Sequence, residues 1–434
     1  ISAEEFIDKF GNWSAFVASS RTLSTIRASQ APSWSTLSYT GSIGAPSGNS
    51  RSYWDADFIF DAGLSENMVV ATNNVDSPYF FTIDKDNTTF SDYTFLDSFM
   101  SKAKSVVAHD NRLVFFNVEA NAVRHPHRFV FTPRGLPTSD SIFAGAGVID
   151  DDAMRGIGQK VVRDREGLLF FTDREIWRAR ARLDIFAYDL FPLTQKLSCP
   201  YPRTIVNTAL GVVFLAQDFE VYLIAGNVIN PLSLLVQGEP SRIKKLLIDE
   251  LTEPDRAWGL YHPRLNRYEL YYNVSGGSYP AHALFFDFET RSWLQQRFAS
   301  HELGAGLIWP EPDPAPGETW DQRGDTFDST IESWNEAGTP QRPALEDADE
   351  MVFSSLGSAF RLLSAQTTDD GTAIDCRWRS HGMAGKRRLA YERLHEIWTE
   401  YEATSASSAS VFCSYDLGTN FDSGFALSLK SSSH

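Results

Sequence analysis

A row of arginines is the arrangement in this sequence best suited to chemistry. Arg178, Arg180 and Arg182 alternate within EIWRARARLDIF, so in a β-strand all three project to one side. Like charges on one face repel unless acidic groups or phosphates face them. The row is therefore either a solvated surface paired with acids of a neighbouring strand, or a set of contacts to another subunit or to channel DNA. In the second case, at least one arginine should meet an acid of an adjacent chain or line the channel.

Two other motifs are weaker indications of a metal or catalytic site. His125-Pro126-His127 offers two imidazoles, but no third ligand follows at a spacing typical of metal sites. Residues 414–421 (SYDLGTNF) match the S-x-D-x-G-x-x-aromatic Asp box of sialidase-type propellers, which is a structural turn. Motifs for nucleophilic serine hydrolysis, zinc proteolysis or nucleotide binding are absent from the sequence. We therefore expect no catalytic residue, no cofactor and no metal site.

Composition favours a β-rich chain and excludes several functional classes. Aromatic residues make up 13% of the 434 residues while methionine occurs only 5 times, which favours sheets over helix bundles. The net charge of −17 argues against a conventional nucleic-acid binder, because affinity for phosphate depends on clustered lysine and arginine. Three scattered cysteines indicate folding in a reducing cytoplasm. We expect neither a membrane-spanning helix nor a secretory leader.

One apolar hairpin pattern is repeated along the chain. GLLFFTDREIW at 167–177 and GVVFLAQDFEVY at 211–222 start 44 residues apart and share the same order of residue types. Similar runs start near residues 68, 112, 267 and 351, and repeats of this length with about four strands are typical of β-propeller blades. We predict a β-propeller of about six blades, with a β-sandwich or a multi-domain β chain as the alternative. Phe170 and Phe214 should then be buried at equivalent positions of adjacent four-stranded units.

The remaining segments suggest additions to the propeller. Apolar spacing predicts helices within 3–26 and 240–256. Residues 301–350 contain 13 acidic residues against 2 arginines, and six prolines, so we expect a projecting, protease-sensitive insertion or linker. The predicted organisation is an N-terminal arm with a helix (1–60), propeller blades (61–300), the acidic Pro-rich insertion (301–350), and a final blade with a C-terminal β element (351–434).

Two long segments carry a family resemblance. HDNRLVFFNVEANAVRHPHRFVFTPRGLPTSD (109–140) and CPYPRTIVNTALGVVFLAQDFEVYLIAGNVINPLS (199–233) resemble blades of the tail-hub or nozzle β-propellers of short-tailed double-stranded DNA bacteriophages, the packaged-DNA stabilisation type. The resemblance to these blades extends to two runs within 262–298, HPRLNRYELYYNV and ALFFDFETRSWLQQRF. The resemblance covers roughly residues 66–300 and the C-terminal block. The acidic insertion departs from the family.

The resemblance implies a structural virion protein without enzymatic activity. Such proteins form a homo-oligomeric ring, usually a hexamer, below the portal and adaptor ring, after folding and assembling in the cytoplasm of the bacterial host. The ring extends the DNA channel without sequence-specific binding, retains the packaged genome until ejection, and docks tail fibres or spikes. The alternative function is a propeller-type carbohydrate-active enzyme or a glycan-binding module.

Overall fold

The protein was analysed as a computed structural model. It describes residues 2–7, 13–27, 35–49, 52–83, 89–182, 188–234, 241–274, 277, 279–298, 303–309, 349–354, 359–362, 368–369, 372–373, 375–377, 407–411 and 425–429. The chain divides into two compact units, Ile1–Trp378 and Arg379–His434. Each unit is described by itself.

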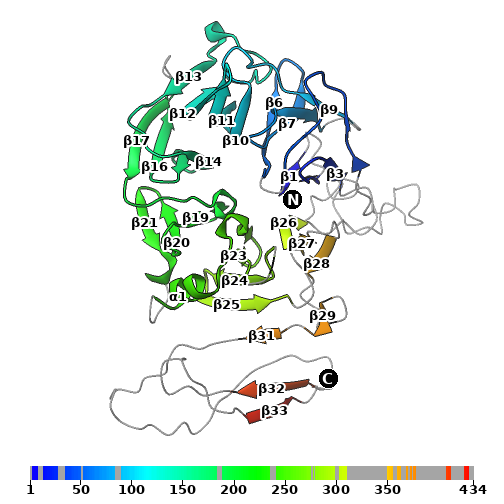
Figure 1. The fold of residues 1–434 in the computed structure, drawn as a ribbon, viewed down its shortest axis with the longest axis vertical. Helices are drawn as coiled ribbons and strands as arrows, with labels where there is room; N and C mark the ends of the chain where they lie inside the picture. The colour runs from blue at the N-terminus through cyan, green and yellow to red at the C-terminus, as the bar shows by residue number, and fades with distance from the viewer. Residues whose placement is uncertain are drawn as a thin grey trace, which may run out of the picture. The chain divides into compact units, whose positions relative to one another are not determined.

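The first unit is built from consecutive antiparallel sheets, each a meander (Figure 1). The first two sheets contain β1 (Ser2–Ile7), β2 (Trp13–Ala18), β3 (Leu23–Arg27) and β4 (Ser35–Thr36), and then β5 (Ser38–Tyr39), β6 (Asp55–Asp61), β7 (Glu66–Thr72), β8 (Tyr79–Thr82) and β9 (Thr89–Asp92). The next two contain β10 (Lys102–His109), β11 (Arg112–Ala120), β12 (Val123–Phe131) and β13 (Gly147–Asp150), and then β14 (Gly158–Asp164), β15 (Gly167–Thr172), β16 (Ile176–Ala181) and β17 (Tyr188–Thr194). The only parallel pairing among these strands joins β5 to β9.

Three further sheets complete the first unit. They contain β18 (Val206–Thr208), β19 (Gly211–Leu215), β20 (Val221–Ala225) and β21 (Val228–Pro231); then β22 (Trp258–His262), β23 (Arg267–Tyr272), β24 (His282–Asp287) and β25 (Ser292–Arg297), with β31 (Asp375–Arg377) added at the edge; and finally β26 (Leu303–Trp309), β27 (Asp349–Ser354) and β28 (Ala359–Leu362). Short connecting elements are η1 (Ile142–Ala144), η2 (Pro202–Thr204), η3 (Leu232–Leu234), α1 (Ser241–Glu250) and η4 (Pro254–Arg256). A separate strand pair joins β29 (Thr368–Asp369) to β30 (Thr372–Ala373).

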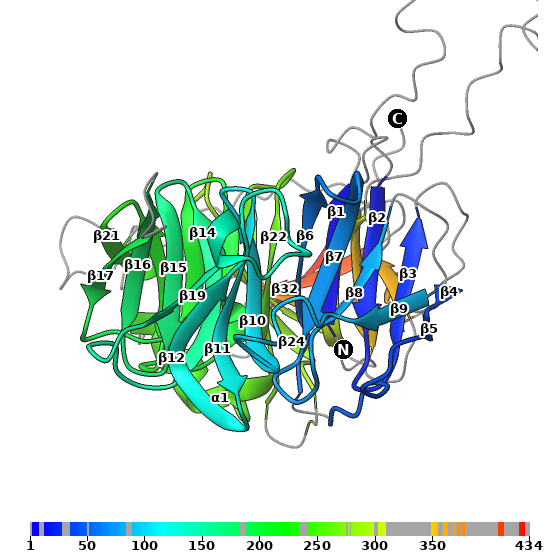
Figure 2. The ribbon, with the colours of Figure 1, turned by 90° about the horizontal axis from the view of Figure 1, so that it is seen from above.

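The first strands of these sheets close a ring. Contacts run from β26 to β1 and on through β6, β10, β14, β18 and β22 back to β26. Within the described residues the ring therefore contains six sheets of four or five strands and one three-stranded sheet. Figure 2 shows the sheets side by side with their strands upright. A closed ring buries both faces of each sheet, which a single sheet cannot do.

The predicted β-propeller is confirmed, and its repeat was placed correctly. The apolar runs near 68, 112, 167, 211, 267 and 351 fall in β7, β11, β15, β19, β23 and β27, the second strands of successive sheets. Phe170 and Phe214 are both fully buried at the fourth residue of β15 and β19. Each contacts an aromatic ring of the preceding sheet. The ring centres of Phe170 and Phe116 are 4.9 Å apart, and those of Phe214 and Phe171 are 5.2 Å apart.

Glycine begins both of these repeats for a steric reason. Gly167 and Gly211 have φ values of +146° and +147°, which strongly favour glycine. A Cβ atom at Gly167 would lie 2.2 Å from the carbonyl oxygen of Ala179, and one at Gly211 would lie 2.0 Å from that of Ile224. Only glycine therefore lets these second strands begin so close to the carbonyl groups of the third strands, β16 and β20.

The helix predicted within residues 3–26 is wrong, while the one within 240–256 is confirmed. The described part of the first segment forms β1, β2 and β3, which close the ring between β26 and β6. The ring centres of Phe6 and Phe16 lie 6.2 Å and 5.8 Å from that of Phe81 in the neighbouring sheet. Tertiary packing therefore overrides the helix-like spacing of the apolar residues. In the second segment, α1 spans Ser241–Glu250.

The predicted acidic insertion begins inside a strand. Residues 303–309 form β26, so the expectation of an irregular segment is wrong there, and residues 310–348 lie outside the described part of the chain. Trp309 pairs with Asp349, so the insertion connects two neighbouring strands of one sheet. The segment predicted to hold a final blade and a C-terminal β element (351–434) contributes β27 and β28 to the last sheet of the ring. In the second unit, β32 (Ser407–Val411) and β33 (Phe425–Leu429) form an antiparallel pair.

Candidate functional site

The structure buries the first arginine of the predicted row. Arg178 is 0% exposed, and its guanidinium lies 2.5 Å from Asp164 and 2.9 Å from Glu166. It also donates a hydrogen bond of 2.8 Å to the carbonyl of Gly226 in the turn between β20 and β21. Arg178 therefore links the sheet of β14–β17 to the next sheet, with its charge neutralised by two carboxylates of its own chain.

The other two arginines are partly exposed. Arg180 pairs with Glu166 at 2.7 Å and lies 5.3 Å from the ring centre of Phe191. Arg182 pairs with Asp189 of β17 at 2.7 Å. The hydrogen bond from Arg180, together with the charge of Arg178, lowers the pKa of the Glu166 carboxyl.

These positions correct one expectation about the row. The charged face does not meet solvent or another molecule at Arg178, because the next sheet of the ring covers that end of β16. None of the three arginines lines the axial cavity described below. Contacts of Arg180 and Arg182 to a neighbouring subunit stay predictions.

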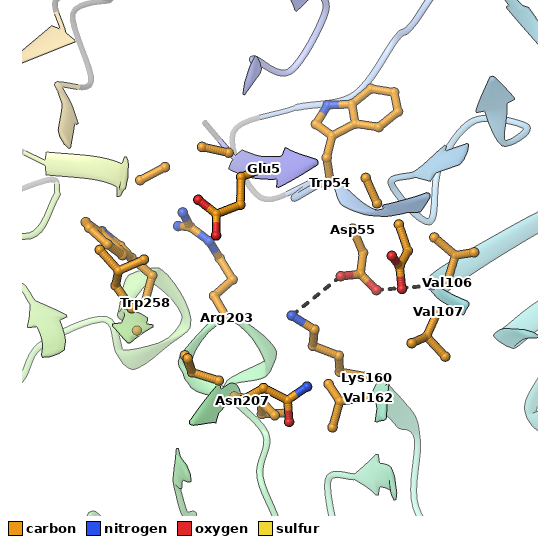
Figure 3. A pocket seen from close by; sticks show the side chains of 18 of the residues that line it. Glu5, Trp54, Asp55, Val106, Val107, Lys160, Val162, Arg203, Asn207 and Trp258 are labelled. Atoms are coloured by element: carbon orange, nitrogen blue, oxygen red, sulfur yellow. Dashed lines mark hydrogen bonds and ion pairs between the residues drawn. The ribbon is translucent and has the colours of Figure 1, made fainter. Parts of the chain in front are cut away.

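A cavity of about 320 Å³ lies on the axis of the ring. Its walls are the first strands of the sheets, together with η2, so they come from residues far apart in the sequence. The charged or amide side chains that line it are Glu5, Asp55, Asp57, Lys160, Arg163, Arg203 and Asn207. Figure 3 shows Glu5 and Arg203 reaching into the cavity and Lys160 joined to Asp55. No local sequence motif marks this site, so it could not be predicted from the sequence.

Two of the cavity carboxylates have fixed partners. Asp55 lies 3.5 Å from Lys160, and accepts hydrogen bonds from the Ser105 hydroxyl at 2.5 Å and the Val106 amide at 3.1 Å. Asp57 accepts hydrogen bonds of 2.8 Å from the amides of Ala108 and Phe58. Burial raises the pKa of Asp57, and the charge of Arg163 partly opposes that change. These two carboxylates tie neighbouring inner strands together.

Several of the exposed apolar side chains lie at turns on one face of the ring. In an antiparallel meander, the turns from first to second strand and from third to fourth strand lie on the same side. We call this side the hairpin face. It carries Leu64, Leu210 and Leu265 in first-to-second turns of three sheets, and Ile142 and Phe143 of η1 in the third-to-fourth connection of another. Phe143 is completely exposed.

The segment that displays Phe143 is firmly held. Buried Arg112 donates hydrogen bonds to the carbonyls of Thr132 at 2.8 Å and Gly145 at 2.5 Å, which bracket the connection between β12 and β13. Tyr93 donates a hydrogen bond to the carbonyl of Pro137, within the same connection. The hydroxyl of Ser141 caps η1 by accepting a hydrogen bond from the Ala144 amide. The exposed pair therefore lies on an ordered projection.

The two histidines of the HPH motif make separate structural contacts. His125 lies 3.6 Å from Asp150, and His127 contacts the carbonyl of Gly156. In the described part of the chain, no three His, Cys, Asp or Glu side chains form a group that could hold a metal ion. The Asp-box residues 414–421 lie outside the described residues. No helix that the structure describes is long and apolar enough to span a membrane.

Comparisons with known proteins found similarity in fold only. No family model matches the chain, and no curated protein matches it. Among solved structures, Raptor from Chaetomium thermophilum is similar over 70% of this chain and 26% of that protein, with a TM-score of 0.41 and 8% sequence identity. This chain thus spans about a quarter of the length of Raptor, and a similarity of this degree says nothing about function.

Proposed function

We propose that this chain is a structural protein of a phage tail, in which several copies form a nozzle or tail-hub ring that extends the DNA channel. The hairpin face is the observation that supports this proposal. Its apolar side chains come from four sheets, and Ile142 and Phe143 are 68% and 105% exposed on an ordered projection. Large apolar side chains this exposed on a folded protein are candidates for a protein interface, and we infer that these take part in one.

The axial cavity does not serve as the DNA passage in this proposal. A volume of about 320 Å³ is too small for duplex DNA, whose major groove alone is about 12 Å wide. The DNA would instead pass through the centre of a ring of several chains, of which six is the number implied by the sequence resemblance. The net charge of −17 suits such a wall, since an acidic surface does not retain DNA that must leave.

The decisive experiment locates the chain in virions of the phage that encodes it. Mass spectrometry should find the chain in purified DNA-filled particles, and gold-labelled antibodies should bind at the tail. Particles from which its gene is deleted should lose their DNA. DNA-filled particles that lack the chain and are stable would overturn the proposal.

A matched pair of variants tests the hairpin face in the same particles. Ile142→Ser with Phe143→Ser should fold normally and fail to enter particles, because both side chains are exposed. Val123→Ser is the control, since Val123 is 56% exposed beside a second-to-third turn on the opposite face. Normal incorporation of the double variant would show that the apolar projection has no part in assembly.

A further inference from the structure

Lys104 is a partly buried lysine that forms no ion pair with any acidic residue in the described part of the chain. It is the third residue of β10, the first strand of its sheet. Its amine donates a hydrogen bond of 2.5 Å to the side-chain oxygen of Gln159, in β14 of the next sheet. Lysine is rarely taken out of water without an acidic partner, so this position is unusual.

A second positive charge acts on Lys104. Arg124 is the second residue of β12, in the same sheet as β10. Its guanidinium donates hydrogen bonds to the carbonyls of Asn117 at 2.9 Å and Asn74 at 3.0 Å, and to the side-chain oxygen of Asn74. All three acceptors are neutral, and the Nε–H group of Arg124 donates to none of the residues that the structure describes. Two neighbouring cations therefore lack an acid as a direct partner.

The surroundings of Lys104 make its amine a nucleophile near neutral pH. Burial, together with the charge of Arg124, lowers the pKa of Lys104 from 10.5 to about 8, while Asp173 and Asp255 oppose the change without pairing with the amine. About a tenth of the Lys104 side chains are therefore uncharged at about pH 7, whereas an ordinary lysine is almost entirely charged. The uncharged form has the lone pair that attacks an electrophile.

We propose that Lys104 is a carbamylation site, at which the amine reacts reversibly with carbon dioxide and the resulting carbamate pairs with Arg124. The nitrogen lone pair forms a bond to the carbon atom, one C=O bond of carbon dioxide opens to give a carboxylate, and one proton leaves the nitrogen for water. The remaining N–H keeps its hydrogen bond to Gln159. The reaction replaces a positive charge that Arg124 repels by a negative charge that Arg124 attracts.

The charge of Arg124 favours carbon dioxide over other small electrophiles. Acylation of Lys104 removes the lysine charge but gives Arg124 no carboxylate. A carbamate accepts charge-assisted hydrogen bonds from the guanidinium, which are about twice as strong as neutral ones. Lys104 lies near the start of β10, at the end of the strand away from the hairpin face, so the inference does not depend on the proposed tail function.

Trapping with triethyloxonium, which converts a carbamate into a stable ethyl ester, tests the proposal. The folded chain is equilibrated with isotope-labelled bicarbonate near neutral pH, trapped, digested and analysed by mass spectrometry. The adduct should form on Lys104, and at least about tenfold less on Lys102 of the same strand, which pairs with Glu119 at 3.0 Å. A peptide with a free amino terminus in the same sample verifies the trapping reaction. No adduct on Lys104, or equal adducts on both lysines, would rule out the site.

Variants of Arg124 test the charge partner of the carbamate. Arg124→Gln should lower the trapped fraction on Lys104 by about tenfold, because the attracting charge is removed, and Arg124→Lys should retain more of it. Arg128→Gln is the control and should leave the fraction unchanged, since Arg128 lies in the same strand but pairs with Asp150 at 2.7 Å. An unchanged fraction in Arg124→Gln would show that the carbamate does not pair with Arg124. Thermal melting curves verify that each variant is folded.

Discussion

Replacing Arg178 by methionine should lower the free energy of unfolding by about 3–5 kcal/mol. Methionine fills much of the space of the buried stem but removes the charge that neutralises Asp164, whose side chain is only 7% exposed. An uncompensated carboxylate between two sheets carries most of the expected loss. The hydrogen bond to the Gly226 carbonyl, which joins those sheets, is lost as well.

Urea unfolding followed by tryptophan fluorescence measures this effect. Arg180→Met and Arg182→Met should each change the free energy of unfolding by less than about 1 kcal/mol, because these arginines are 49% and 42% exposed and water solvates their partners. The pair Arg178→Met with Asp164→Asn should recover part of the loss, since no buried charge then lacks a partner. A loss below about 1 kcal/mol for Arg178→Met, or no recovery in the double variant, would refute this reasoning.

Three further predictions concern the core and the cavity. Phe214→Ala should cost about 3–5 kcal/mol in urea unfolding, because the buried ring contacts the preceding sheet, and a cost below about 1 kcal/mol would contradict that packing. Gly211→Ala should destabilise the protein by more than about 1 kcal/mol, since the new Cβ meets the Ile224 carbonyl; an unchanged melting temperature would contradict the turn geometry. Burial raises the pKa of Glu5 from 4.5 to about 7 in the folded protein. Its contribution to the free energy of unfolding is therefore fully present below about pH 4.5 and is lost as the pH rises through 7. Glu5→Gln should therefore gain melting temperature relative to the native chain between these pH values, and a constant difference would contradict the shift.

The repeat was predictable because its residue types are set by local geometry. Gly167 and Gly211 are needed where two of the second strands begin, and each second strand needs apolar residues on both faces because neighbouring sheets cover it. Other first-to-second turns use a different residue with positive φ, as Asn111 and Asn266 do. The apolar runs located six second strands, including β15 and β19, without any knowledge of long-range contacts.

The N-terminal sheet and the buried arginine were missed for a different reason. Phe6 and Phe16 are spaced as in an amphipathic helix. Only their contact with Phe81 of another sheet favours strands for this segment. Arg178 was expected on an outward face, because alternation predicts one polar and one apolar side. In a ring of sheets both sides are buried, and an acidic pair such as Asp164 and Glu166 then allows an arginine inside. The cavity was equally hidden, since Glu5 and Arg203 are almost two hundred residues apart.

The hairpin face carries exposed apolar residues that the stability of the ring does not require. Contacts between sheet faces stabilise the ring, and most residues of the buried clusters lie in the strands, so residues at hairpin turns can be polar. Leu64, Leu210 and Leu265 nevertheless occupy such turns and are 44–50% exposed. Phe143 adds a fully exposed ring, held out by contacts of Arg112. Because these apolar side chains contribute little to the stability of the isolated ring and reduce its solubility, a covering partner explains them better than the fold does.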